Sequence, residues 1–582
     1  MRRYLPILEW GRHYDRLSLL SDLLAAVIVT IMLIPQSLAY ALLAGLPPEI
    51  GLYASIAPLL AYALFGTSRV LAVGPVAVVS LMTAAAVAPL AAQGSAEYLG
   101  AAIVLAALSG LILLAMGLLR LGWIANFISH PVMAGFITAS ALLIAAGQVP
   151  TLLGLQARGE TLPSLFMALL PKLESARLDV LALGLAVTGF LFWARKGVQP
   201  LLRSFGMRPE LAAAAGRAAP LLAVAASILL VRLTDLAPPL VGEIPRGLPL
   251  PALPSLDPAL WQALLVPAAL IALVGYVESV SVAQTLAARR RQRIAPDQEL
   301  VALGAANLSS AFTGGFPVTG GFARSVVNAD AGATTPAAGA FTALGMVMAS
   351  FWLTPLLADL PKATLAATII VAVLALVDLR ALPRMLAYSR ADGGAMAATI
   401  AATLLLGVET GITAGVVLSI FLHLWRSSRP HMAVIGQVPG TEHFRNVERH
   451  HVVTAPDVLS IRVDESLYFP NVRFLEDRLL IALAEKPGLA HVVLDCAAVN
   501  VIDASAVETL EQLMSRLDEA GVALHLSEVK GPVMDRLQRS SFLQHLTGRI
   551  FLTQFDAMMA LAPDLTAGCR AADRCETARR RG

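Results

Sequence analysis

Residues 314–321 read Gly314-Gly315-Phe316-Pro317-Val318-Thr319-Gly320-Gly321, and residues 72–75 read Ala72-Val73-Gly74-Pro75. Each stretch breaks an apolar region with glycine and proline, and each leads into a short helix that tolerates polar residues. At membrane depth, broken backbone is tolerated only where it is buried in protein or lines a cavity. If the chain lies in a membrane, these two stretches predict two broken helices inside a helical bundle.

The composition places the chain in a membrane. Of its 582 residues, 57% are hydrophobic and 14% are charged, and the mean hydropathy is +0.71. An ordinary soluble protein has roughly 25% charged residues. The net charge of +3 gives no reason to expect a nucleic acid partner. The three cysteines lack metal-ligand or redox spacing, and no metal site or cofactor is expected.

Apolar runs near the length of a spanning helix follow one another from Leu23 to about Leu424. The first 21 residues have charges of both signs and no cleaved signal peptide is expected. We expect about fourteen spans, with twelve as the alternative, near residues 22–43, 50–65, 74–91, 98–119, 128–148, 179–194, 218–234, 262–287, 299–313, 322–333, 336–354, 363–378, 391–407 and 409–426.

Basic residues orient these spans. Cytoplasmic connections carry an excess of lysine and arginine, and here the basic residues gather in the even-numbered connections. These hold Arg69, Arg120, the stretch from Arg195 to Arg217, the cluster Arg289, Arg290, Arg291 and Arg293, and the group Arg380, Arg384 and Arg390. The pattern predicts a multi-pass protein of the cell membrane with both termini in the cytoplasm.

The two broken segments stand at matching places, third among the first seven spans and third among the second seven. Interrupted segments at corresponding positions of two halves are typical of a transporter site built on an inverted repeat. Two kinked structural helices are the alternative. If the N-termini of two half-helices converge, their N–H groups and positive dipole ends attract an anion.

Arg324 opens the second of these half-helices and adds a fixed positive charge. An arginine inside a membrane is expensive and usually has a counter-charge or a ligand. The sequence therefore favours contact between Arg324 and an anion. An internal salt bridge with Glu278 or Asp330 is the alternative.

Several motifs together resemble the sulfate permease (SulP) family of anion transporters. The opening signature covers Ile34 to Ala41, Ala44 to Pro48 and Gly51 to Ser55, and continues through Gly66 to Arg69 and Val73 to Val78. Pro317 to Ser325 resembles the family's tenth-helix motif. The match runs over nearly the whole chain.

This resemblance implies seven plus seven spans in an inverted repeat, divided into a core domain (spans 1–4 and 8–11) and a gate domain. It implies that the anion lies between helices three and ten, with contacts from Tyr40, Val76, Ala323 and Arg324. Gln36, one helical turn before Tyr40, can face the same cavity; a hydrogen bond that stabilises the Pro35 kink is its alternative role. Many relatives read Thr-Gly-Ser-Phe-Ser-Arg where this chain has Gly321 and Ala323, so fewer hydroxyl groups surround the anion.

Glu278 in the eighth span is a functional candidate, because a carboxylate buried in a membrane is costly. Burial favours its protonated form, which predicts a role in proton coupling. In sodium-coupled bicarbonate transporters resembling this chain, a threonine stands four residues after the acidic residue. Val282 stands there instead and offers no oxygen to sodium. The alternative is that Glu278 supports the half-helices or neutralises Arg324.

After residue 430 the pattern changes to a soluble α/β domain. Residues 458–463 and 491–496 have strand patterns, residues 507–520 have helical spacing, and residues 521–526 form a further strand. The stretch Val501 to Ala506 resembles the core motif of a STAS domain, with Ala504 where related bacterial antagonists carry a phosphorylatable serine. We interpret Ser505 as a helix N-cap. Dimer contact, trafficking or regulation through a cytoplasmic protein partner are the roles that the resemblance implies.

The predicted organisation is a cytoplasmic segment at 1–21, a transport domain at 22–428, a STAS domain with its linker at 429–565 and a disordered tail at 566–582. The predicted function is secondary active transport, with sulfate taken up by proton symport or anion exchange, in a homodimer. A bicarbonate or dicarboxylate transporter, a channel-like anion conductor, a nucleobase symporter and a membrane sensor of anions are the alternatives. An enzyme or an ATP-driven pump is not expected, because the sequence has no catalytic triad, metal cluster or phosphate-binding loop.

Overall fold

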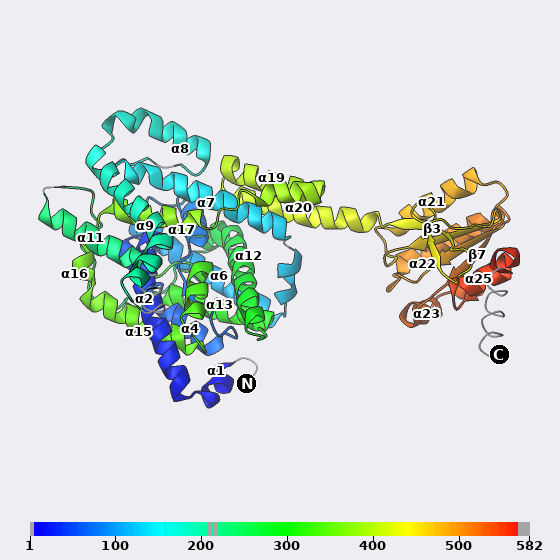
Figure 1. Ribbon diagram of the computed structural model, residues 1–582, viewed down its shortest axis with the longest axis horizontal. Coiled ribbons are helices and arrows are strands. Elements are labelled where there is room, and N and C mark those ends of the chain that lie inside the picture. The colour runs from blue at the N-terminus through cyan, green and yellow to red at the C-terminus, as the bar shows by residue number, and fades with distance from the viewer. Residues whose placement is uncertain are drawn as a thin grey trace. The chain divides into compact units, whose positions relative to one another are not determined.

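The computed structural model describes residues 5–567 apart from 128, 158, 208–211, 213–215, 217 and 235. The chain divides into two compact units, Met1–Ser419 and Ile420–Gly582. The first is helical, and the second is built around a β-sheet (Figure 1). Cys569, Cys575 and most of the tail expected at 566–582 lie outside the described residues.

Each of the fourteen predicted spans falls on helix, and the second is divided between two short helices. The first seven are α2 (Arg16–Leu43), α3 and α4 (Pro48–Tyr53 and Ala57–Phe65), α5 (Ala77–Val87), α6 (Ala96–Leu118), α7 (His130–Leu152), α9 (Leu178–Ser204) and α11 (Ala219–Leu233). The second seven are α12 (Pro258–Arg289), α13 (Pro296–Phe312), α14 (Phe322–Asp330), α15 (Ala337–Trp352), α17 (Lys362–Leu374), α19 (Arg390–Leu406) and α20 (Val408–Ser428).

Short helices outside these spans were not predicted. They are α1 (Ile7–Trp10), η1 (Gly11–His13), η2 (Gly122–Phe127), α8 (Leu162–Leu169), η3 (Leu170–Ser175), α16 (Thr354–Leu357) and α18 (Ala381–Tyr388). Among the described residues, seven helical segments are long and apolar enough to cross a membrane, and four apolar helices are shorter. Half-helix α5 is one of the shorter four.

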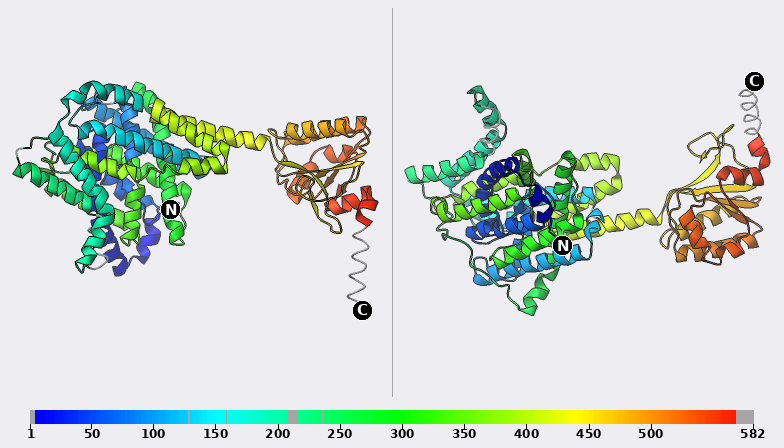
Figure 2. Two further views of the ribbon diagram at one scale, coloured as in Figure 1. Left: turned by 45° about the horizontal axis from the view of Figure 1, so that its top comes forward. Right: turned by 90° about the horizontal axis from the view of Figure 1, so that it is seen from below.

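The helices of the first unit pack in two groups. In one group α13 and α12 lie against α6, α13 lies against α4, and α15 lies against α2. In the other, α7 packs on α17 and α19, and α9 packs on α11 and α17. Figure 2 shows the helices of this unit from two further directions. These groups correspond to the expected core and gate domains.

Glycines bring α6 and α13 into backbone contact. A Cβ on Gly110 would stand 2.8 Å from the backbone nitrogen of Leu308, and a Cβ on Gly304 would stand 2.8 Å from that of Leu114. Small residues allow membrane helices to approach closely and gain van der Waals contact. The contact holds together the helix group from which the broken segments emerge.

The second unit contains one six-stranded sheet in the order β4-β3-β5-β6-β7-β8. Its strands are β3 (Met432–Gln437), β4 (Phe444–Asn446), β5 (Val458–Val463), β6 (His491–Asp495), β7 (Ala523–Ser527) and β8 (Ile550–Phe551). The pairs from β5 to β8 are parallel, and β3 is antiparallel to both β4 and β5.

The two faces of this sheet follow the alternation of the strands. Leu459, Ile461, Val492 and Leu494 face one apolar cluster, which includes α21 (Val472–Glu485), α22 (Ala504–Glu519), α23 (Gly531–Leu537) and α24 (Phe542–His545). Val458 and Val493 face the other, which α25 (Gln554–Leu561) covers. The predicted α/β domain is confirmed, and β3, β4 and β8 are additional to the predicted strands.

The N-cap prediction for α22 was wrong. The cap is Asp503, whose extended backbone lets its carboxylate accept a hydrogen bond of 2.8 Å from the N–H of Ala506. The other carboxylate oxygen accepts one from the N–H of Phe469. Ser505 is inside the first turn, since α22 begins at Ala504.

Candidate functional site

The two broken segments meet through a short antiparallel ladder. Strand β1 (Val73–Gly74) pairs with β2 (Thr319–Gly320), placing Val73 opposite Gly320 and Gly74 opposite Thr319. The N–H of Gly321 also donates to the carbonyl of Ala72 at 3.1 Å. This ladder joins two segments far apart in the sequence immediately before each begins its half-helix.

Hydrogen bonds from α12 and α13 hold the ladder in place. The hydroxyl of Thr319 donates to the carbonyl of Gly275 at 2.7 Å, and the hydroxyl of Ser279 accepts from the N–H of Gly320 at 2.9 Å. The side-chain amide of Asn307 bonds both the N–H and the carbonyl of Val318, each at 2.9 Å. All four hydrogen bonds are buried, so the broken backbone is satisfied by protein rather than by lipid.

Both half-helices begin without a side-chain cap. Val76 is the N-cap residue of α5 and Gly321 is that of α14, and neither receives a side-chain cap hydrogen bond. The first intrahelical donors in these helices are the N–H groups of Ser80 and Ser325. Within the described residues, the preceding N–H groups of each first turn have no acceptor and can bind a ligand, and the dipole at each end favours an anion.

Arg324 lies in the first turn of α14 with its side chain buried, at 2% exposure. Its Nη1 and Nη2 atoms have no hydrogen-bond partner in the described part of the chain. Two glycines leave room for the guanidinium group: a Cβ on Gly74 would be 3.0 Å from Nη1, and a Cβ on Gly321 would be 3.0 Å from Nε and Nη2. A buried cation without a counter-charge is strongly unfavourable, so the arrangement calls for an anionic partner.

Glu278 and Tyr40 lie close enough to Arg324 for electrostatic interaction. The alternative salt bridge is not formed, since Arg324 makes no ion pair with Glu278 or Asp330 among the described residues. The Glu278 side chain is half-buried rather than enclosed, and Tyr40 is 8% exposed. The site therefore combines a cation, a carboxylate and a phenol on α14, α12 and α2.

The other predicted site residues lie around this group. Val76 is at the start of α5, and Ala323 is exposed at the start of α14. Gln36 is half-buried on α2, and its side chain makes no hydrogen bond to any residue that the structure describes, so the Pro35-stabilising alternative is not seen there. Val282, which stands where a threonine oxygen could bind sodium in related sodium-coupled transporters, is buried, at 5% exposure.

Sequence reasoning missed the part that Gly74 and Gly321 play in making space for the guanidinium. Gly74 was interpreted only as part of a backbone break, and Gly321 as part of a break and as a position where many relatives have serine. It also missed Glu299, buried on α13, whose carboxylate accepts hydrogen bonds from Tyr62, Thr67 and Ser68 and so anchors the chain leading to β1. An acidic residue within an apolar run was the available signal for Glu299. Among the described residues, no cluster of three metal-ligating side chains is found.

Comparison with known proteins agrees with this architecture. The sulfate permease family model matches residues 19–399, and the STAS domain model matches residues 450–557. The chain is 34% identical over 574 residues to sulfate transporter 4.1 of Arabidopsis thaliana, covering 96% of this chain and 81% of that protein. It is 35% identical over 556 residues to a probable sulfate transporter of Mycobacterium tuberculosis, covering 94% of this chain and 96% of the relative.

Solved structures share the fold. The murine solute carrier 26 family member A9, an anion transporter solved in an inward-facing state, superimposes with a TM-score of 0.85 at 22% identity, covering 96% of this chain and 93% of that chain. The transmembrane domain of the cyanobacterial bicarbonate transporter BicA gives a TM-score of 0.60 at 24% identity, covering 69% of this chain and 98% of that chain. With a family match over most of its length and relatives above 30% identity, this chain belongs to the sulfate permease family and carries a C-terminal STAS domain.

Proposed function

We propose that this chain is a secondary active anion transporter whose foremost substrate is sulfate. The observation that supports this most is Arg324, a buried guanidinium with two unpartnered nitrogens between two uncapped half-helix ends. The names of the relatives, sulfate transporters in Arabidopsis thaliana and Mycobacterium tuberculosis, agree with an oxyanion substrate. The bound anion would contact Arg324, Tyr40, Gln36 and the first turns that begin at Val76 and Ala323.

Transport would proceed by alternating access. The helix group holding α5 and α14 would move as a body against the group built on α7, α9, α17 and α19, carrying the anion from one side to the other. We assign residues 22–428 to transport and residues 429–565 to regulation. We place both termini in the cytoplasm and expect a homodimer.

Coupling would reside in Glu278. A proton on this carboxylate removes a negative charge from the neighbourhood of the incoming anion, so proton and anion would bind together. Glu278 is half-buried and makes no ion pair with Arg324 among the described residues, which agrees with a carboxylate that can take up and release a proton. Anion exchange is the other mode open to the same site.

Uptake of labelled sulfate into proteoliposomes tests this proposal. We expect saturable uptake that an acidic exterior accelerates in the wild type and in Glu409→Gln, a carboxylate at the start of α20. The Glu278→Gln variant should lose the response to the pH gradient. Sodium-dependent uptake would contradict proton coupling, large single-channel currents would indicate a channel, and competition by bicarbonate, chloride and dicarboxylates would establish the preferred anion.

A further inference from the structure

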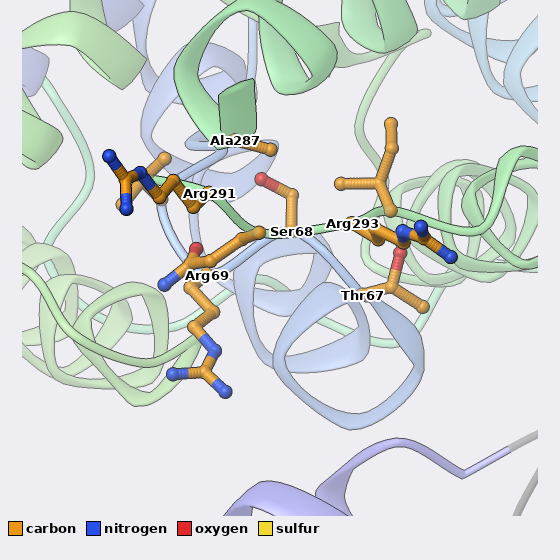
Figure 3. Close-up of a pocket in the computed structure, with 9 residues that line it drawn as sticks. Thr67, Ser68, Arg69, Ala287, Arg291 and Arg293 are labelled. Atoms are coloured by element: carbon orange, nitrogen blue, oxygen red, sulfur yellow. The ribbon is translucent and has the colours of Figure 1, made fainter. Parts of the chain in front are cut away.

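A second cationic pocket lies in the helical unit, apart from the Arg324 site. It has a volume of about 260 Å³ and is formed by the connections between α4 and β1 and between α12 and α13 (Figure 3). Its lining contains three arginines and no carboxylate: Thr67, Ser68, Arg69, Val70, Ala287, Arg291, Gln292, Arg293 and Ile294.

The three arginines have no partner in the described part of the chain. None of Arg69, Arg291 and Arg293 makes an ion pair or a side-chain hydrogen bond there, although Arg290 beside them donates to the carbonyls of Ala329 and Ala333. In Figure 3 the three labelled arginine side chains extend in different directions around the loops, as expected of like charges without a counter-ion. Exposed side chains change rotamer rapidly and can turn toward a bound anion.

Backbone donors are also available at this place. The N–H groups of Arg69, Val70, Arg293 and Ile294 have no acceptor among the described residues. Successive free N–H groups in a loop bind anions well, and arginine matches the geometry of phosphate and sulfate oxygens. The side chains and the backbone thus independently indicate the same class of ligand.

The backbone of Arg291 adopts a left-handed conformation at the end of α12. It has a φ of 54° and ends α12 in the position after the C-cap, with its N–H bonded to Ala288 and that of Gln292 bonded to Ala287. Glycine is the usual residue at this position because it alone adopts the left-handed conformation without cost. Arg120, which follows the C-cap of α6 and does not line the pocket, has a similar φ of 58°, so the conformation of Arg291 does not by itself indicate a ligand.

We propose that this pocket is a second anion site, which binds a phosphate-type oxyanion as a free ion or as the headgroup of an anionic phospholipid. Two hydrogen bonds link the loop that lines the pocket to α14: the carbonyl of Val70 accepts one of 3.0 Å from Asn328, and the N–H of Ala72 donates one of 3.0 Å to Ser325. An occupied pocket would hold the 67–70 loop and, through these bonds, α14. The inference does not depend on sulfate being the transported anion.

Inorganic phosphate is the first probe. Thermal unfolding of the detergent-solubilised full chain should shift upward with phosphate and saturate, as expected for a ligand that binds the folded state. In Arg291→Gln/Arg293→Gln, the half-saturating phosphate concentration should rise about tenfold or more, since charge-assisted hydrogen bonds are lost. Arg289→Gln is the matched control, because Arg289 is exposed in the same segment but does not line the pocket.

An Arg324→Gln variant separates the two sites. The proposal requires that its phosphate shift persist; a shift lost in Arg324→Gln but kept in Arg291→Gln/Arg293→Gln would overturn it. An equal loss in Arg289→Gln would also overturn it, because the effect would then be general charge. Unfolding temperatures without phosphate should agree between the wild type and the pocket variant, which shows that the variant folds.

The lipid source is tested in nanodiscs of phosphatidylcholine with and without phosphatidylglycerol. Phosphatidylglycerol retained in native mass spectra of the wild type and Arg289→Gln, but lost in Arg291→Gln/Arg293→Gln, would support a headgroup site even if free phosphate is without effect. If neither phosphate nor phosphatidylglycerol distinguishes these variants, the pocket is not an anion site.

Discussion

The phenol of Tyr62 on α4 donates a hydrogen bond of 2.7 Å to the carboxylate of Glu299 on α13, 237 residues along the chain. The other carboxylate oxygen accepts from the N–H and hydroxyl of Thr67 and from the N–H of Ser68, at 2.8, 2.5 and 3.0 Å. Glu299 is fully buried. A single side chain thus fixes the loop that carries Arg69 of the arginine pocket and leads to β1.

Glu299→Ala should strongly destabilise the helical unit. The substitution leaves buried donors of Tyr62, Thr67 and Ser68 unsatisfied, and each buried unsatisfied group costs about 1–3 kcal/mol. The measurement is thermal unfolding of the purified chain. Glu174→Ala, on an exposed part of η3, is the control and should leave the unfolding temperature within error of the wild type. Equal unfolding temperatures for both variants would show that Glu299 does not anchor the loop.

Gly321→Ala should weaken anion binding with little effect on folding. The added Cβ would stand 3.0 Å from Nε and Nη2 of Arg324, and the flexible side chain would move away. We expect sulfate affinity to fall about tenfold, the value of one hydrogen bond to a charged group. Gly147→Ala on α7, where a Cβ meets nothing within 4 Å, is the control. Unchanged affinity in Gly321→Ala would show that the guanidinium position is not critical.

His525 predicts a pH response in the STAS domain. Burial, with the charges of His491 and Arg549, lowers the pKa of His525 to about 4. Its Nδ1 accepts a hydrogen bond of 3.0 Å from the N–H of Arg549, and its Nε2 lies 3.2 Å from Nδ1 of His491. The unfolded chain, in which histidine has a pKa near 6.5, therefore takes up a proton first as the pH falls. Stability should be complete above about pH 6.5 and decline toward pH 4.

Hydrogen exchange of the segment containing β8, corrected for the intrinsic rate, measures this response in the full chain. The wild type and the exposed control His443→Gln should lose protection between pH 6.5 and 4, and His525→Gln should lose less. Parallel loss in all three would assign the acid sensitivity to other groups.

Local patterns made much of this fold predictable. The length of the apolar runs located the helices, and the Gly/Pro breaks around Val73 and Val318 located the two half-helices. The breaks could not show that Thr319 hydrogen-bonds to α12 or that Ser279 hydrogen-bonds to β2, because such contacts depend on how distant helices pack. The N-cap at Asp503 was missed for a local reason: aspartate and serine are both good caps, and the extended backbone at Asp503 decided between them.

The candidate site was predictable in residue type but not in detail. An arginine at the start of a half-helix predicts an anion-binding site, and this prediction does not depend on how the helices pack. Whether Arg324 pairs with Glu278 or stays unpaired depends on where α12 and α14 lie, and the space at Gly74 depends on the β1–β2 register. The loop anchor at Glu299 joins residues more than 200 positions apart, beyond the reach of any local pattern.

Binding of labelled sulfate to the purified chain tests the central claim, that the anion is held by Arg324 between α5 and α14. We predict saturable binding in the wild type and in Arg289→Gln. When Arg324→Gln is combined with Arg291→Gln/Arg293→Gln, which removes the second pocket, binding should be lost, whereas Arg291→Gln/Arg293→Gln alone should keep it; the unfolding temperature of Arg324→Gln without sulfate should be kept or raised, because the buried charge is removed. Wild-type sulfate affinity in the folded combined variant would contradict the claim.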